Sequence, residues 1–342
     1  MNLKKIATIS ISLTVLIVIA VLTFLLQPSG HVQDFAKWLY QPQQSERNNQ
    51  NPSRLTVRFF GVSTLLFDDG QTQILIDGFF TRPSLTQTLF KPVESDPKLI
   101  TKVIQEYDLK RLQAVFTSHS HYDHALDIAE LAKQELAKQL PVKIIGSESS
   151  INIARGGEVP EAQLQQIQPL QTMQFGEFKV TALPSQHTPP TAVNNDLGEV
   201  IHHPLKQPAR FSEFKEGHSF DYLIEHQGYK VLVKASTGFV PNQLHNIHVD
   251  TLFLGIAQLS RQKTEYQQQY LAQTIATVKP KVVIPIHWDN FWEPLPLQQP
   301  LEFLPFIADN TSKSMQILIN NAEQHHAKVV LLTQPVVYPL QK

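Results

Sequence analysis

The stretch that decides the fold comprises residues 119–124, which read His119-Ser120-His121-Tyr122-Asp123-His124. It follows an apolar run at 113–117 that is typical of a buried strand. Residues two apart in an extended segment face the same side, so His119 and His121 can direct both rings at one metal ion. Asp123 and His124 stand where the chain turns into a helix, and they point to a second position nearby. A polar loop that is rich in histidine by chance is the alternative, and the density of donors makes it the weaker one.

Short β-rich runs broken by turns surround this stretch from residue 55 onward. In the first half we expect strands at 55–60, 63–67, 73–76, 113–117 and 142–145, with helices at 97–107 and 125–140. In the second half we expect strands at 178–183, 220–225, 230–234, 251–254, 281–286 and 328–332, with helices at 264–278 and 312–325. This arrangement indicates two sheets face to face with helices on both outer sides, which is an α/β fold of the four-layer αββα type. A long Pro-rich excursion at 188–217 is a candidate lid.

The first 26 residues are predicted to form a transmembrane anchor. Lys4 and Lys5 precede an uncharged apolar run at 6–26, whose length suits a bilayer core of roughly 30 Å. The lysines favour a cytoplasmic N-terminus, which would leave the rest of the chain on the extracytoplasmic or periplasmic side of the inner or cytoplasmic membrane. A cleaved signal peptide is the alternative, but the run is long for one. Residues 27–54 then form a polar linker, and residues 55–342 form the functional domain.

Composition narrows the classes of function. The chain of 342 residues has a formal net charge of -1 and no long basic run, so nothing in it attracts nucleic acid. It contains no cysteine, which excludes disulfides and thiolate ligands. Any metal must therefore sit on histidine and carboxylate, and the 14 histidines supply the first of these.

The pattern H-x-H-x-D-H at 119–124 resembles the signature of the metallo-β-lactamase superfamily. The segment RFFGVSTLLFDDGQTQILIDGFF at 58–80 resembles the opening strand pair of that fold, and PKVVIPIHWDNFW at 280–292 resembles its last metal-histidine strand. The resemblance covers residue 55 to the C-terminus. It leans toward the branch of ascorbate-phosphate lactonases and N-acyl phosphatidylethanolamine phospholipase D.

This resemblance implies a metal-dependent hydrolase with further ligands. His187 takes the place of the third histidine of the first metal site, which then comprises His119, His121 and His187. His287 takes the place of the second-site histidine, beside His124 and Asp123. Asp123 is also the candidate catalytic residue, as orienter of a water, acceptor of its proton or ligand of the second ion. The resemblance implies one or two divalent ions, Zn first, with Mn and Fe as alternatives.

One position departs from the pattern of the superfamily. Ser236 stands where a bridging aspartate is expected, and a neutral hydroxyl is a weak ligand. The site therefore holds one ion, or two with a weaker second, unless Asp289 or His218 compensates. Asp77 is either the carboxylate that fixes a histidine tautomer or a plain turn aspartate before Gly78.

The substrate is predicted only by class, as a lactone, an ester or a phosphodiester, either a soluble small molecule or a lipid-derived one. Four aromatic residues are candidates for an apolar wall or for core, namely Phe79, Phe80, Trp288 and Phe291. A metal-binding protein with weak or no catalysis, serving binding or assembly at the membrane, is the second hypothesis, and Ser236 supports it. A nuclease is disfavoured by the neutral charge. No feature of the sequence predicts an oligomer.

Overall fold

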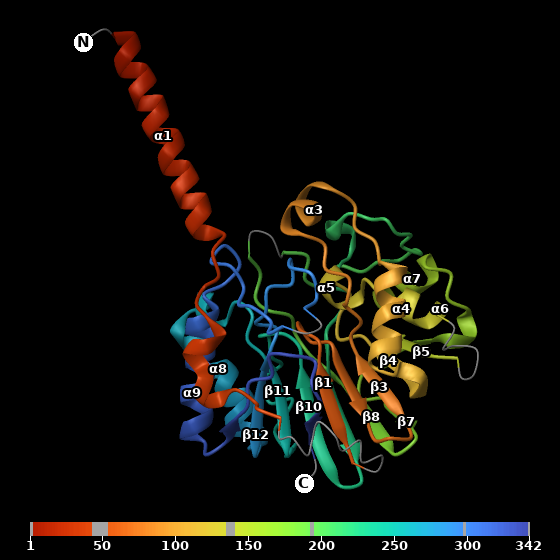
Figure 1. Ribbon diagram of the computed structural model, residues 1–342. Helices are drawn as coiled ribbons and strands as arrows, with labels where there is room; N and C mark the ends of the chain where they lie inside the picture. Colours follow the sequence, from red (N-terminus) through yellow and green to blue (C-terminus); the bar gives the residue numbers. More distant parts are fainter. Residues whose placement is uncertain (1–2, 43–53, 135–140, 192–194, 297–298, 341–342) are drawn as a thin grey trace.

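Two β-sheets pack face to face, and helices cover the outer side of each (Figure 1). The computed structural model describes residues 3–42, 54–134, 141–191, 195–296 and 299–340. The layers confirm the predicted αββα sandwich. They follow from the strand pattern, because each sheet has to bury one face against the other sheet and one against helices.

The first sheet contains seven strands among the described residues. Their spatial order is β14 (Tyr338–Pro339), β1 (Thr56–Phe59), β2 (Leu65–Asp68), β3 (Gln73–Ile76), β4 (Leu112–Phe116), β5 (Lys143–Gly146) and β6 (Leu164–Gln166). Pairing is antiparallel from β14 to β3 and parallel from β3 to β6. Parallel neighbours need crossover segments, and these carry α3 (Leu85–Phe90), α4 (Pro97–Glu106), α5 (Tyr122–Ala125), α6 (Ile128–Lys133) and α7 (Glu148–Gly156).

The second sheet also contains seven strands among the described residues. Their order is β13 (Lys328–Val329), β12 (Val282–Ile286), β11 (Thr251–Gly255), β10 (Tyr229–Lys234), β9 (Phe220–His226), β8 (Phe178–Pro184) and β7 (Thr172–Phe175). Its crossovers carry α8 (Thr264–Leu271), which continues into a π-helical turn η7 (Ala272–Ala276), and α9 (Thr311–Gln324). These helices lie on the side opposite α4 and α6 (Figure 1).

The core follows the two-residue period of the strands. On β4, Ala114 and Phe116 face the core between the sheets, whereas Val115 faces the helices. Across the sandwich, the rings of Phe67 and Phe253 meet edge to face with centroids 5.9 Å apart. The two sheets are therefore held by one continuous apolar layer.

The ends of several strands meet at one edge. β8 and β10 both pair antiparallel with β9, and β10 runs parallel to β11 and β12, so β8, β10 and β12 end on the same side. The end of β4 joins them, because the backbone N–H of Phe220 donates to the carbonyl of Ser118 at 2.8 Å. The segments that follow these strands therefore converge.

The prediction of one helix at 125–140 is wrong in two respects. The helix begins earlier than predicted, and it is interrupted. The chain enters α5 at Tyr122, leaves the helical path at Asp127 and forms α6 from Ile128 to Lys133. The cause is the buried Asp127 carboxylate, which accepts from the backbone N–H groups of Phe80 and Thr81 at 2.7 Å each. Residues 135–140 of the prediction lie outside the described residues.

Part of the predicted linker packs on the sandwich. The 3-10 helix η1 (Val32–Trp38) buries Val32 and Phe35 in the core, and Phe35 meets Phe303 with ring centroids 5.7 Å apart. Lys37 forms an exposed ion pair with Glu323 of α9 at 3.1 Å. The polar stretch at 43–53 lies outside the described residues, so the domain boundaries stay predictions.

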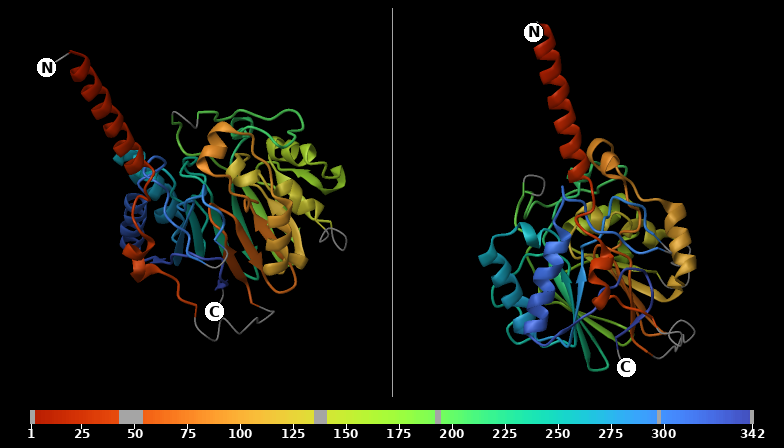
Figure 2. Two further views of the ribbon diagram at one scale, coloured as in Figure 1. Left: turned by 45° about the horizontal axis from the view of Figure 1, so that its top comes forward. Right: turned by 60° about the vertical axis from the view of Figure 1, so that its left-hand side comes forward.

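The N-terminal segment forms α1 (Leu3–Leu25), which stands away from the sandwich in every view (Figures 1 and 2). Among the residues that the structure describes, no helix has both the length and the apolar character needed to cross a membrane. The predicted transmembrane helix at 6–26 therefore has no support from the structure.

Candidate metal centre

Three segments, which follow β4, β8 and β12, bring the predicted ligands together. His119 and His121 follow β4, Asp123 and His124 lie in α5, and the other two histidines follow β8 and β12. His287 has a left-handed backbone (φ 56°), which is uncommon for a residue with a side chain. Its N–H donates to the carbonyl of Val62 at 2.6 Å, which holds this conformation. Such positions persist only where the surrounding structure fixes them, as it does here beside the other donors.

The first group consists of His119, His121 and His187. One ligand atom from each lies within 4.8 Å of the others. His119 is buried, and its Nε2 atom has no hydrogen-bond partner among the described residues. A buried nitrogen without a partner is costly unless something binds it, so this atom is the clearest sign that the group fits a metal ion.

The second group consists of Asp123, His124 and His287. Oδ2 of Asp123 lies 3.6 Å from Nε2 of His124 and 3.4 Å from Nε2 of His287. All three side chains are buried, and their ligand atoms also lie within 4.8 Å of one another. The ring centroids of His119 and His124 are 3.8 Å apart, so the two groups adjoin.

The outer nitrogens of several rings are held by oxygen atoms. Asp77, which is fully buried, accepts from Nδ1 of His124 at 2.8 Å and from the N–H of Ser118 at 2.6 Å. Nδ1 of His187 donates to the carbonyl of Thr188 at 3.2 Å. Fixing one nitrogen of an imidazole sets its tautomer and leaves the other for an ion. Of the two roles left open for Asp77, the geometry favours the one that fixes a histidine.

Burial and neighbouring charges set the protonation of the site. Burial lowers the pKa of His119 and His187 well below the usual value, and the neighbouring histidines lower it further. Burial alone would raise the pKa of Asp123, but His124 and His287 outweigh it and hold that pKa far below the usual range. Neutral imidazoles beside an ionised carboxylate are the protonation states that bind divalent metal.

No second carboxylate replaces the missing bridging aspartate among the described residues. Ser236 is nearly buried at the end of β10. Asp289 is committed elsewhere, because it pairs with the buried Arg82 at 2.9 Å and accepts from the N–H of Val62 at 2.6 Å. His218 is not one of the grouped donors either. The site therefore has one carboxylate within its two ligand groups.

The excursion is an ordered cover rather than a loose lid. The structure describes 188–191 and 195–217 of it, and residues 195–217 are called the cover. The carbonyl of Glu216 accepts from both the N–H and the Oγ of Ser120, at 3.0 and 3.1 Å. The carboxylate of Asp196 reaches Nε2 of His121 with both oxygens at 3.2 Å. Sequence reasoning missed both acidic residues, because nothing in a Pro-rich loop marks which carboxylate folds back onto a strand end.

The predicted aromatic wall is mostly core. Phe79, Phe80 and Trp288 are completely buried. Phe291 is half-buried, and its ring lies 5.8 Å from that of His287. The rings of Trp292 and Phe291 are tilted against each other with centroids 4.8 Å apart, and Nε1 of Trp292 donates to the hydroxyl of Tyr122 at 3.1 Å. Of the predicted wall, Phe291 therefore lies next to the metal centre, with Trp292 beside it, and no pattern in the sequence singles out Trp292.

Comparison with known proteins agrees with this geometry. A family model described as a beta-lactamase superfamily domain matches residues 72–288, more than half of the chain. The chain belongs to the metallo-β-lactamase superfamily. A curated relative, a UPF0173 metal-dependent hydrolase from Heliobacterium modesticaldum, is 37% identical over 79 residues, which is 23% of this chain. The match spans only 26% of that relative's length. The predicted enzyme class agrees with this relative.

Two solved structures share the fold. The metallo-beta-lactamase fold protein YhfI from Bacillus subtilis has a TM-score of 0.52 at 14% identity, over 84% of this chain and 99% of that one. CmlA, a diiron beta-hydroxylase from Streptomyces venezuelae, has a TM-score of 0.52 at 14% identity, over 86% of this chain and 55% of that one. At this identity the likeness concerns the fold alone.

Proposed function

We propose that this protein is a metal-dependent hydrolase that cleaves a lactone, an ester or a phosphodiester. One observation carries the proposal. Two adjoining groups of buried donors each have ligand atoms within 4.8 Å of one another, namely His119, His121 and His187 in the first and Asp123, His124 and His287 in the second. Burying so many imidazoles costs free energy unless they bind something. A cluster of this kind at the ends of strands therefore indicates a functional site.

The donor set fits a divalent ion. Imidazole and carboxylate without thiolate suit Zn, and they also suit Mn and Fe. Such an ion would act as a Lewis acid and make water a stronger nucleophile at neutral pH. Iron is a necessary comparator, because the name of one structural neighbour describes it as a diiron enzyme.

Asp123 is the residue that we assign to the reacting water. Its carboxylate is ionised at neutral pH, since His124 and His287 hold its pKa low against the effect of burial. A carboxylate with so low a pKa is a weak base, so it orients a water or binds an ion better than it stores a proton. We therefore place Asp123 as an orienting group and ligand, and Asp77 as the group that holds the ring of His124.

Membrane attachment through α1 is part of the proposal. From Leu13 to Leu26 the large apolar side chains of the segment, apart from the half-buried Leu25, are exposed, Leu16 at 62% and Leu13 at 57% among them, and the run at 6–26 has no charge. An apolar surface of this extent calls for a lipid or protein partner. Lys4 and Lys5 favour an N-terminus on the cytoplasmic side, with the catalytic domain on the extracytoplasmic or periplasmic side.

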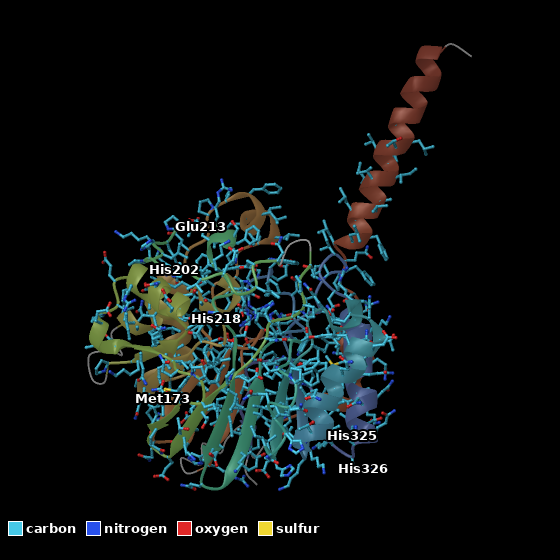
Figure 3. All side chains as sticks on the ribbon, turned by 180° about the vertical axis from the view of Figure 1, so that it is seen from behind. Met173, His202, Glu213, His218, His325 and His326 are labelled. Carbon is cyan, nitrogen blue, oxygen red and sulfur yellow. The ribbon has the colours of Figure 1, made fainter. Side chains whose placement is uncertain are left out.

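A lipid-derived substrate would fit this placement. His202, Glu213 and His218 of the excursion lie in the half of the molecule from which α1 leaves, whereas His325 and His326 lie at the other end (Figure 3). The covered metal centre would then lie near the lipid surface. A soluble lactone or ester remains the competing substrate.

A metal-binding protein with weak catalysis is the second candidate, and the lack of a bridging carboxylate at Ser236 favours it. One experiment separates the two. The full chain is purified in detergent, its Zn, Mn and Fe content is measured by mass spectrometry, and lactones, esters and phosphodiesters are assayed with and without a chelator. The hydrolase predicts bound metal and chelator-sensitive turnover. Bound metal without turnover would favour the second candidate, and a metal-free active protein would contradict both.

A further inference from the structure

The outer nitrogens of the first ligand group are not held alike. Nδ1 of His187 donates to a neutral carbonyl, and Nδ1 of His119 lies 3.3 Å from the hydroxyl of Ser118. Only His121, among the described members of this group, has a carboxylate at its outer nitrogen, Nε2, which both oxygens of Asp196 approach at 3.2 Å. This contact leaves Nδ1 as the atom that His121 can offer to an ion.

We propose that Asp196 is a positioning residue that holds His121 and couples the cover at 195–217 to metal binding. The proposal rests on the proposed function, because it needs the first group to bind an ion. The proposal assigns to Asp196 a negative charge on the outer side of the first group. Three imidazoles form that group, and Ser236 supplies no bridging carboxylate, so a carboxylate behind His121 would help to balance a divalent ion there.

Asp196 is suited to this role by its own surroundings. Its side chain is 17% exposed, so the contact with His121 is poorly screened by water. Both oxygens of Asp196 approach the same ring nitrogen, so the carboxylate accepts a hydrogen bond that His121 donates.

Hydrogen bonds from other residues of the cover hold Asp196 in place. The N–H of Glu216 donates to Oδ2 of Asp196 at 3.1 Å, and the N–H of Glu199 donates to the carbonyl of Asp196 at 2.9 Å. The buried carboxylate of Glu216 accepts from the N–H of Gly198 at 3.0 Å. Asp196 and Glu216 are thus joined into one unit.

Asp196 and Glu216 form hydrogen bonds with two consecutive residues of the metal-binding stretch. Glu216 holds Ser120 by its backbone carbonyl, and Asp196 holds the ring of His121. Gly217 lets the cover approach closely, since a Cβ there would lie 2.3 Å from Oγ of Ser120 and its φ is 69°. A shift of the cover therefore moves His121, and fixing His121 by an ion fixes the cover. Coupling of this kind is reciprocal.

The test uses the full chain in detergent and two readouts other than activity. Zinc affinity is measured by competition with a chromophoric chelator for wild type, Asp196→Ala, Asp196→Asn and Glu213→Gln. Glu213 is the matched control, because it lies exposed in the same cover and its carboxylate accepts from the N–H of Arg210 rather than from a ligand residue. Loss of an outer-shell partner predicts about 10–100-fold weaker zinc binding by Asp196→Ala. Asp196→Asn, which keeps an acceptor without charge, is expected to fall between, and Glu213→Gln to match wild type.

Hydrogen exchange tests the coupling itself. In the wild type, zinc should slow exchange of the amides at 195–217, and Asp196→Ala should lose this effect while α9 keeps its protection. Wild-type affinity in Asp196→Ala, or exchange at 195–217 that does not respond to zinc in the wild type, would overturn the inference and leave the proposed function intact. A wild type that binds no zinc, manganese or iron would overturn both.

Discussion

At the scale of single residues, the charge of the metal centre is the property that matters most. The two ligand groups contain five histidines and one carboxylate, Asp123. Carboxylates held in or beside a metal site balance the charge of the ion and tune its affinity. A serine at 236 should therefore weaken binding of a second ion more than of the first, because the first group is complete with three imidazoles.

Replacing Ser236 by aspartate should restore the missing charge. For Ser236→Asp we expect the second equivalent of zinc to bind at least about tenfold more tightly, the lower bound set by the 10–100-fold that one supporting carboxylate contributes. Metal per chain across a zinc titration measures it. Asn310→Asp is the control, since Asn310 caps α9, which carries none of the ligands, and aspartate caps equally well. An unchanged second equivalent would count against this reading of position 236.

The six ligand candidates could be predicted because they follow strands in a pattern tied to one superfamily. His119, His121, Asp123 and His124 needed only the local sequence, whereas His187 and His287 needed the resemblance. Asp196 could not be predicted, since its role depends on how an irregular segment folds back. Asp289 looked available in sequence, but it serves a buried pair with Arg82.

At the scale of elements, a buried ion pair joins three strand ends beneath the loop of His187. Lys234 of β10 contacts Asp221 of β9 and Oγ of Ser185, which follows β8, at 3.0 Å each. Lys234 is 1% exposed and Asp221 5% exposed, measured on their side chains. Removing one member of such a pair leaves an uncompensated buried charge, whereas removing both does not.

Asp221→Asn should accordingly lower the free energy of unfolding by about 3–5 kcal/mol, because it leaves the buried Lys234 ammonium without its negatively charged partner. The double variant Asp221→Leu with Lys234→Met should recover most of this loss, since an apolar pair of similar volume avoids the desolvation cost. Urea unfolding of Asp221→Leu, Lys234→Met and the double variant measures the coupling, with Asp221→Asn measured beside them. Additive losses would mean that the two residues do not act as a pair.

The predicted and observed elements differ where contacts between residues distant in sequence, rather than the local sequence pattern, determine the structure. Long strands such as β8 and β10 carry enough apolar residues to be predicted from the sequence alone. The short strand β14 could not be foreseen, because its pairing with β1 joins the two ends of the domain. The helix after the metal-binding stretch breaks at Asp127, whose partners Phe80 and Thr81 are more than forty residues away.

At the scale of the whole molecule, α1 is the segment through which we propose membrane attachment. Its last turn is fixed to the body, because the rings of Phe24 and Phe306 stack with centroids 4.9 Å apart and the N–H of Ile307 donates to the carbonyl of Leu25 at 2.8 Å. The rest of the helix projects from the sandwich (Figure 2). A lipid surface that received α1 would thus hold the domain close to it.

Charges placed on α1 should release the chain from lipid. We expect Leu16→Lys with Ile19→Lys to abolish cosedimentation of the full chain with phospholipid vesicles, since each lysine costs about 2.5–3.5 kcal/mol in an apolar membrane position. Leu170→Lys, at another exposed apolar residue, should leave vesicle binding unchanged. Vesicle binding that survives the α1 variant would contradict the proposed attachment.

The buried histidines and Asp123 are proposed to form a hydrolytic metal centre. The most direct measurement compares bound metal and turnover in the wild type, His119→Ala and His325→Ala, the last being an exposed histidine at the end of α9. We predict that His119→Ala loses bound metal by at least about tenfold, because loss of a ligand costs more than loss of an outer partner, and that turnover falls with it. His325→Ala should match the wild type. Turnover that persists in His119→Ala would contradict the assignment of these residues as the hydrolytic metal centre.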